Sequence, residues 1–131
     1  MATPVVIGQV AGDYKTASLD LDFVNAVGDA LAVAALVDTG LSEDAAIDSE
    51  AVEKLGLTAV GSALAEMADG SVVPTRTYDV SVRVGEVIEK RVIAVEAEVC
   101  MVGLPFFRGR RLSIDVQGGG DVSVINLNEL G

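Results

Sequence analysis

Carboxylates are almost the only side chains in this sequence that could carry out acid–base chemistry. The 131 residues include 20 Asp and Glu, one Cys and no His. Without histidine, the Ser-His and Cys-His forms of nucleophilic catalysis are excluded, and a zinc site is not expected. Any catalysis by this chain should therefore depend on aspartate or glutamate, with no metal and no cofactor.

One carboxylate, Asp38, has a setting suited to catalysis. It follows the apolar run 30–37 and precedes Thr39 and Gly40. The run predicts a strand buried on both faces, and glycine lets the chain turn sharply after it. Such a strand can hold an acid rigidly, as acid–base catalysis requires. Two plainer interpretations stay open: Asp38 caps amides of its own turn, and Thr39 is simply a β-branched strand end.

Short apolar or alternating stretches predict a chain made mostly of strands. Residues 17–23 and 78–84 alternate apolar and polar side chains, which is typical of strands with one buried face. Further strands are expected over 5–10, 59–67, 72–73, 87–95, 99–102, 112–116 and 122–127. Asp69-Gly70 indicates a hairpin tip, which strands need whatever the function, and Pro74 indicates an edge or a bulge.

Two short helices are expected among these strands. The first covers 49–55, with Asp48 as its cap, Ile47 and Val52 as a hydrophobic staple, and Gly56 as its left-handed end. The second covers 106–110 and is begun by Pro105. Without repeats or linkers, the chain is predicted to be one all-β domain, 1–131, forming a sandwich or closed barrel.

The composition argues against several classes of partner. The net charge of −11 repels nucleic acid and anionic membranes. No apolar run is long enough to span a bilayer, and the start has no signal-peptide pattern, so we expect a soluble cytoplasmic protein. The lone Cys100 is expected to pack as a small hydrophobe. The acids Glu43, Asp44 and Asp48 lack calcium-loop spacing and predict a solvated loop.

Several segments form a recognisable series along the chain: Asp38-Thr39-Gly40, Leu55-Gly56-Leu57, the Asp-Gly hairpin, Met101-Val102-Gly103 and Leu112-Ser113-Ile114-Asp115. Together they resemble the retropepsin-like aspartic proteases that carry one Asp-Thr-Gly per chain. The likeness covers about 15–127 and is carried by the Asp-Thr-Gly after an apolar strand, with Gly103 some sixty residues later. It implies an all-β closed barrel of the acid protease fold, with one or two short helices, that acts as a homodimer.

The resemblance also implies roles for particular residues. Two carboxylates about 3 Å apart share a proton, so Asp38 of each subunit would activate a water that cleaves a peptide bond. Thr39 would hydrogen-bond across the dyad. Met101, Val102 and Gly103 would form the ψ-shaped loop beneath the turn. Peptide or protein substrate would contact the residues Gly40, Ser42, Ala68, Asp69, Gly70 and Ser71, the last four as a flap.

The sequence also differs from the family pattern beside the acid. Leu41 stands where alanine is usual, and Glu43 and Asp44 bring charge to positions that are often apolar. A rival interpretation is therefore an inactive retropepsin-fold module for peptide binding or dimerisation. An edge hairpin can bind extended peptide by strand addition without cutting it.

Overall fold

The computed structural model describes residues 3–130, so Met1, Ala2 and Gly131 at the ends of the predicted domain lie outside the described part. Helical structure is limited there to α1 (Ser49–Leu55) and the 3-10 segments η1 (Leu104–Phe107) and η2 (Leu127–Glu129). The strands are β1 (Val5–Val10), β2 (Ala17–Val24), β3 (Ala30–Asp38), β4 (Ala45–Ile47), β5 (Gly61–Glu66), β6 (Val72–Val84), β7 (Ile88–Glu96), β8 (Met101–Gly103), β9 (Arg110–Ile114) and β10 (Asp121–Asn126).

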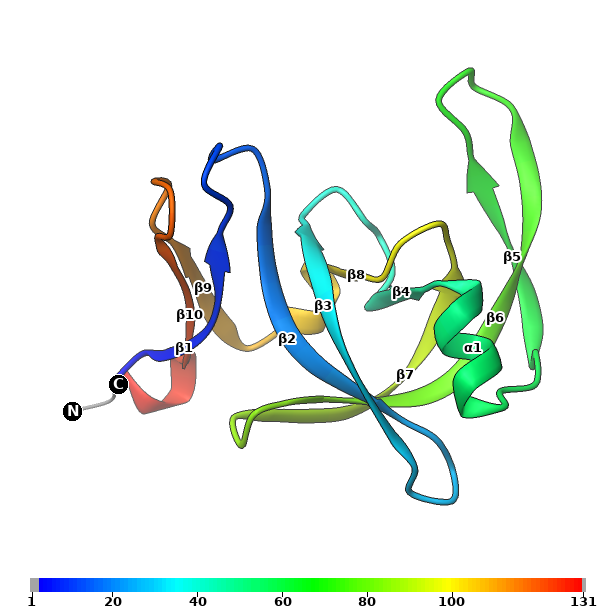
Figure 1. Cartoon of the computed structure of the whole chain (residues 1–131), viewed down its shortest axis with the longest axis horizontal. Coiled ribbons are helices and arrows are strands. Elements are labelled where there is room, and N and C mark those ends of the chain that lie inside the picture. The colour runs from blue at the N-terminus through cyan, green and yellow to red at the C-terminus, as the bar shows by residue number, and fades with distance from the viewer. Residues whose placement is uncertain (1–2, 131) are drawn as a thin grey trace.

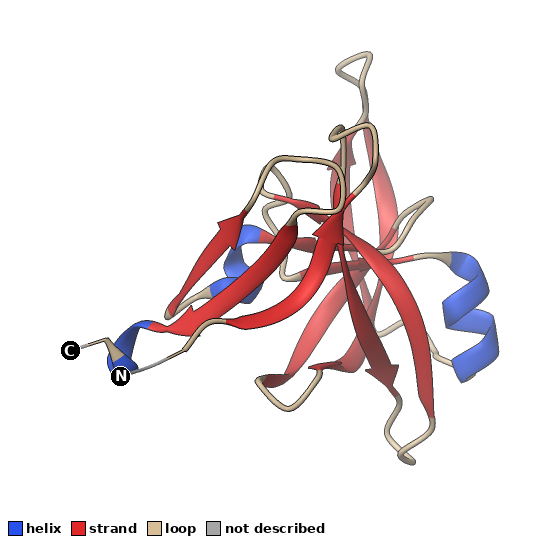
Figure 2. Ribbon diagram, turned by 60° about the vertical axis from the view of Figure 1, so that its left-hand side comes forward, coloured by secondary structure: helices blue, strands red, loops and turns tan. Residues whose placement is uncertain are grey.

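These strands form one sheet that closes on itself. Its order is β5-β6-β7-β4-β8-β3-β2-β1-β10-β9, and an additional pairing of β6 with β2 closes six of the strands into a barrel. The β5–β6 hairpin projects from the barrel beyond this closure, while β1, β10 and β9 extend the sheet on the other side (Figure 1). Figure 2 shows α1 on the outside of the sheet. The prediction of an all-β closed barrel is confirmed.

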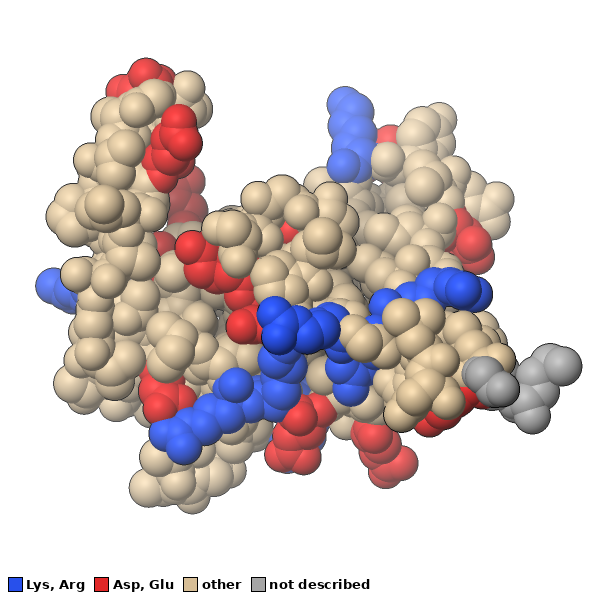
Figure 3. Space-filling view, turned by 180° about the vertical axis from the view of Figure 1, so that it is seen from behind, with Lys and Arg blue, Asp and Glu red and all other residues tan. Residues whose placement is uncertain are grey.

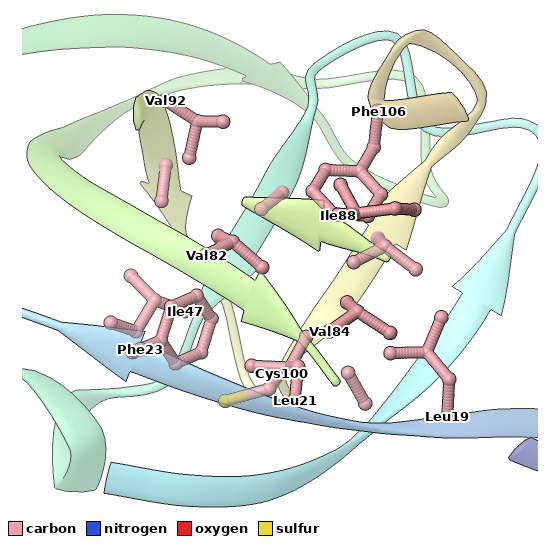
Figure 4. Packing of buried hydrophobic residues seen from close by; sticks show 14 of the residues in the cluster. Leu19, Leu21, Phe23, Ile47, Val82, Val84, Ile88, Val92, Cys100 and Phe106 are labelled. Atoms are coloured by element: carbon pink, nitrogen blue, oxygen red, sulfur yellow. The ribbon is translucent and has the colours of Figure 1, made fainter. Parts of the chain in front are cut away.

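The core is filled by the inward faces of the alternating strands. On β2 the buried side chains are Leu19, Leu21 and Phe23, and on β6 they include Val82 and Val84 (Figure 4). A period of two places them on one face, as the sequence predicted. Cys100 is 7% exposed and joins the same cluster, so the expectation that it packs as a small hydrophobe is confirmed.

The prediction that residues 30–37 are buried on both faces is wrong for this chain. Only Ala35 is fully buried in β3, and Ala30, Ala32 and Ala34 are exposed on the outer face. The strand lies in the barrel wall, paired with β2 and β8, and its outer face is open to solvent at these three alanines. Alanine tolerates this position because its exposed methyl group is small.

The first helix was predicted correctly and the second was not. In α1, Asp48 Oδ1 accepts a hydrogen bond from the Ala51 amide at 2.8 Å, and Gly56 has a φ of 62°. The predicted helix over 106–110 is instead the 3-10 segment η1, which ends earlier. Arg108 already leaves helical geometry, with a ψ of 133°, and Gly109, at a φ of 81°, makes the turn after which β9 begins.

Some strand boundaries also differ from the sequence prediction. β4 was not predicted, because three residues carry too little pattern and its pairing partners, β7 and β8, lie far along the chain. β6 is one strand through Pro74, where two shorter strands were expected. Pro74 pairs with Leu64 of β5, and β7 joins β6 only from Thr77 onward, so Pro74 does lie on a free edge.

Candidate active site

Asp38 is the last residue of β3 and leads directly into a tight turn. Its Oδ1 accepts a hydrogen bond from the Gly40 amide at 2.9 Å, and its carbonyl accepts one from the Leu41 amide at 3.1 Å. The carboxylate therefore caps its own turn, as the plainer interpretation held, and it is also exposed. A Cβ at residue 40 would lie 3.3 Å from Asp38 Oδ1, so glycine leaves that oxygen uncrowded.

The segment Met101–Gly103 lies directly beneath this turn. β8 runs parallel to β3, with Gly103 opposite Asp38, and the Gly103 amide donates to the Asp44 carbonyl at 3.0 Å. A Cβ on Gly103 would come within 2.1 Å of the Glu43 carbonyl oxygen and 2.6 Å of the Leu41 carbonyl oxygen. Only glycine allows the loop to rest this closely on β8.

An ion pair fixes the far end of the same loop. Lys90 Nζ lies 2.7 Å from Asp44 Oδ1, 3.4 Å from the Pro105 carbonyl oxygen and 5.5 Å from the centre of the Phe106 ring. The lysine thus joins the loop after Asp38 to β7 and to η1. Asp44 is therefore neutralised by a cation of the chain itself.

A cleft of about 560 Å³ opens beside Asp38. Such a volume falls within the range common for ligand sites, roughly 300–1,000 Å³. Of the residues expected at the site, Asp38, Gly40, Ser42 and Met101 line it. The other lining residues come from the loop, from β4, from the β5–β6 hairpin below its tip and from the end of β7 with the residue after it: Leu41, Glu43, Ala46, Leu64, Ala65, Glu66, Thr75, Val95, Glu96 and Ala97.

The hairpin tip, Ala68 to Ser71, does not line this cleft. Asp69 Oδ1 accepts hydrogen bonds from the Ser71 hydroxyl at 2.6 Å and the Ser71 amide at 2.9 Å, which hold the pKa of Asp69 below its usual value. Gly70 has a φ of 85°, as a tight turn requires. These residues form a well-made turn, and their contact with substrate stays a prediction.

Thr39 lies in a different hollow from Asp38. This hollow, of about 520 Å³, is formed by η1, β9 and the residues between them. Its apolar lining residues are Leu104, which is 57% exposed, Phe107, Leu112 and Ile114, and Arg108 and Arg110 also line it. Val102 and Gly103 are buried. The turn after β3 therefore presents Asp38 to the cleft and Thr39 to a neighbouring surface made of apolar side chains and two arginines.

Three polar residues of the cleft were missed by the sequence analysis: Glu66, Thr75 and Glu96. Glu96 Oε1 accepts a hydrogen bond from the Tyr78 hydroxyl at 3.2 Å, and its carbonyl accepts one from the Thr75 hydroxyl at 3.0 Å. Thr75 and Glu66 could have been found from the hairpin, since both lie on its two strands below the tip. Glu96 gave no local signal, because only the barrel brings the end of β7 to this position.

Metal and membrane features can be stated for residues 3–130. In that part of the chain, no group of three or more His, Cys, Asp or Glu side chains is arranged to hold a metal ion. The same residues contain no helix that is long and apolar enough to cross a membrane.

The fold of the chain is similar to that of a solved structure. The chain is similar to a retropepsin-like aspartic protease from Rickettsia conorii, with a TM-score of 0.62, 17% sequence identity, and coverage of 96% of this chain and 92% of that chain. The barrel thus has the retropepsin-like fold. The family described as aspartyl protease matches residues 25–123, and the chain belongs to this family. No curated protein matches the sequence significantly.

Proposed function

We propose that the chain is an aspartic endopeptidase that acts as a homodimer. The observation that carries the proposal is the exposed Asp38, presented to a cleft by a turn that rests on Gly103, in a chain of the aspartyl protease family. Each subunit supplies one such Asp38. Two copies related by a twofold axis bring a second identical carboxylate to the first, as an isologous interface does.

In the proposed reaction, the paired carboxylates share one proton. One Asp38 takes a proton from a water molecule, while the protonated Asp38 of the other subunit polarises the carbonyl of the scissile peptide bond. The water oxygen bonds to the carbonyl carbon while the carbonyl oxygen receives the shared proton. The C–N bond then breaks: the proton taken from the water passes to the leaving amine, and the proton on the former carbonyl oxygen returns to the carboxylate pair. The chain's own contribution is to hold Asp38 in its turn and to leave room at Gly40 for the substrate backbone.

The hollow beside Asp38, which is apolar apart from Arg108 and Arg110, supports the proposed dimer. Thr39 and the largely exposed Leu104 lie there, next to the turn that the two subunits have to share. A second copy docked at this face would cover apolar surface and let Thr39 of each subunit reach the opposing turn. Burial of apolar surface is the main driving force of such association.

Replacement of Asp38 by asparagine tests the proposal. Asp38→Asn keeps the size of the side chain and removes the group that carries the proton, so peptide cleavage should fall by at least about 100-fold. Asp20→Asn is the matched control, because Asp20 is exposed on β2 and does not line the cleft. Circular dichroism and sedimentation should be unchanged in both variants. Undiminished cleavage by Asp38→Asn would end the proposal.

The rival function, peptide binding without cleavage, has one observation in its favour. Among the described strands, β5 pairs only with β6, so its other edge is free of them and can add a strand of bound peptide. If wild-type protein binds a mixed peptide library but releases no fragments, in the presence or absence of the acid protease inhibitor pepstatin, this interpretation replaces the enzymatic one.

A further inference from the structure

The walls of the Asp38 cleft carry charge of one sign. Besides Asp38, its charged lining residues are Glu43, Glu66 and Glu96, and no Lys or Arg of residues 3–130 lines it. Viewed from behind, acidic side chains lie on both sides of the notch between the projecting hairpin and the barrel (Figure 3). The Lys and Arg atoms of that face lie outside the notch, most of them in a band lower on the molecule.

In the described part of the chain, none of these three glutamates belongs to an ion pair. Among the described residues, the ion pairs join other acids to Lys or Arg, and none includes Glu43, Glu66 or Glu96. Glu43 accepts a hydrogen bond from Ser42 at 3.1 Å, which is a neutral partner. Their negative charge is therefore available to a molecule that enters the cleft, and a concave site concentrates such a field.

Glu96 is the best anchored of the three. Its carboxylate is held by the hydroxyl of Tyr78, a side chain that is only 2% exposed, and its backbone carbonyl is held by Thr75. It stands at the end of β7 in the barrel wall, whereas Glu66 belongs to the projecting hairpin. Glu96 thus offers a fixed negative charge on the floor of the cleft, and Glu66 offers one on the hairpin side.

We infer that the cleft selects peptides with a lysine or arginine side chain near the bond to be cut. The inference rests on the proposed function, since the peptide is the substrate of the same site. A cationic side chain entering the cleft meets two or three unpaired carboxylates, and each partly exposed pair is expected to improve binding by up to about fivefold. Acidic peptides are repelled by the same groups and by Asp38.

The test compares two quenched fluorescent peptides that differ only in lysine or methionine beside the scissile bond. Wild-type protein should cleave the lysine peptide with kcat/KM about tenfold higher, and the advantage should shrink as NaCl rises from about 50 to 500 mM. Glu96→Gln and Glu66→Gln should each reduce the preference about threefold. Glu89→Gln is the matched control: it removes the same charge from the same strand, β7, outside the cleft.

Binding to the Asp38→Asn variant separates this inference from the proposed function. Fluorescence anisotropy with the two labelled peptides measures the charge preference without any cleavage. A preference for lysine that falls about threefold in Asp38→Asn/Glu96→Gln and is unchanged in Asp38→Asn/Glu89→Gln supports the inference, even if wild-type protein cuts nothing. Cleavage or binding that does not distinguish lysine from methionine overturns it, as does a preference that all the glutamate variants keep.

Discussion

The close contact at Gly103 makes a quantitative prediction about the loop that follows Asp38. A methyl group at this position would lie 2.1 Å from the Glu43 carbonyl oxygen and 2.6 Å from the Leu41 carbonyl oxygen, whereas ordinary contacts begin near 3.4 Å. The first oxygen would have to move by about 1.3 Å and the second by about 0.8 Å, the differences from 3.4 Å. Both are backbone atoms, so the whole loop must shift.

Gly103→Ala should therefore lower both stability and activity. Overpacking of a tight interior contact costs about 1–3 kcal/mol, and this contact belongs at the upper end because it involves two backbone carbonyls. A displacement of about 1 Å at a catalytic group costs about 100-fold in rate, so cleavage should fall by that order. Urea denaturation measures the first effect, and kcat/KM on a peptide substrate measures the second.

Gly12→Ala is the matched control for this experiment. A Cβ on Gly12 meets no atom within 4 Å, so its free energy of unfolding should stay within about 0.5 kcal/mol of wild type. The reasoning is refuted if Gly103→Ala unfolds at the same urea concentration as Gly12→Ala. Lost stability with undiminished cleavage would instead refute the claim that this contact positions Asp38.

Three further predictions concern residues outside the cleft. Lys90→Met should destabilise the fold by about 1 kcal/mol in thermal or urea unfolding, because it leaves the half-exposed Asp44 without its cation, and Lys90→Arg should recover part of the loss. Arg91 hydrogen-bonds Asp79 and lowers the pKa of that carboxyl, so this contribution is present above the ordinary pKa of aspartate and lost as pH falls through the lowered value. The Tm difference between wild type and Arg91→Met should accordingly vanish at low pH; a difference that is independent of pH contradicts the assignment. Burial raises the pKa of the Cys100 thiol, so iodoacetamide at pH 7.5 should modify it only in urea-unfolded protein, and rapid labelling of the folded chain would show the core to be open there.

Local patterns sufficed for the parts of the fold that are stabilised locally. The alternation in β2 and β6 reflects one buried face, and the ends of α1 are set by Asp48 and Gly56, which lie next to it in sequence. The three-residue strands β4 and β8 depend on pairing with distant segments, so their bounds could not be read from composition.

In the site, too, features set by neighbouring residues could be predicted, and features set by distant segments could not. Asp38 and Gly103 could be found because each directly ends an apolar stretch, which is a feature visible in a few neighbouring residues. The outer face of β3 was misjudged because its exposed residues are alanines, which look the same in sequence whether they are buried or not. Glu96 became part of the cleft only through closure of the barrel, and no spacing along the chain relates it to Asp38.

The central claim is that two subunits share one active site, and mixed subunits test it most directly. Wild-type protein, always at the same concentration, is refolded either alone or with a tenfold excess of the Asp38→Asn variant, and peptide cleavage is measured in both samples. Random pairing leaves about a tenth of the wild-type subunits with a wild-type partner, so activity should fall to about that level. The same excess of Asp20→Asn should raise activity instead. Cleavage that is unaffected by the Asp38→Asn subunits would contradict the account.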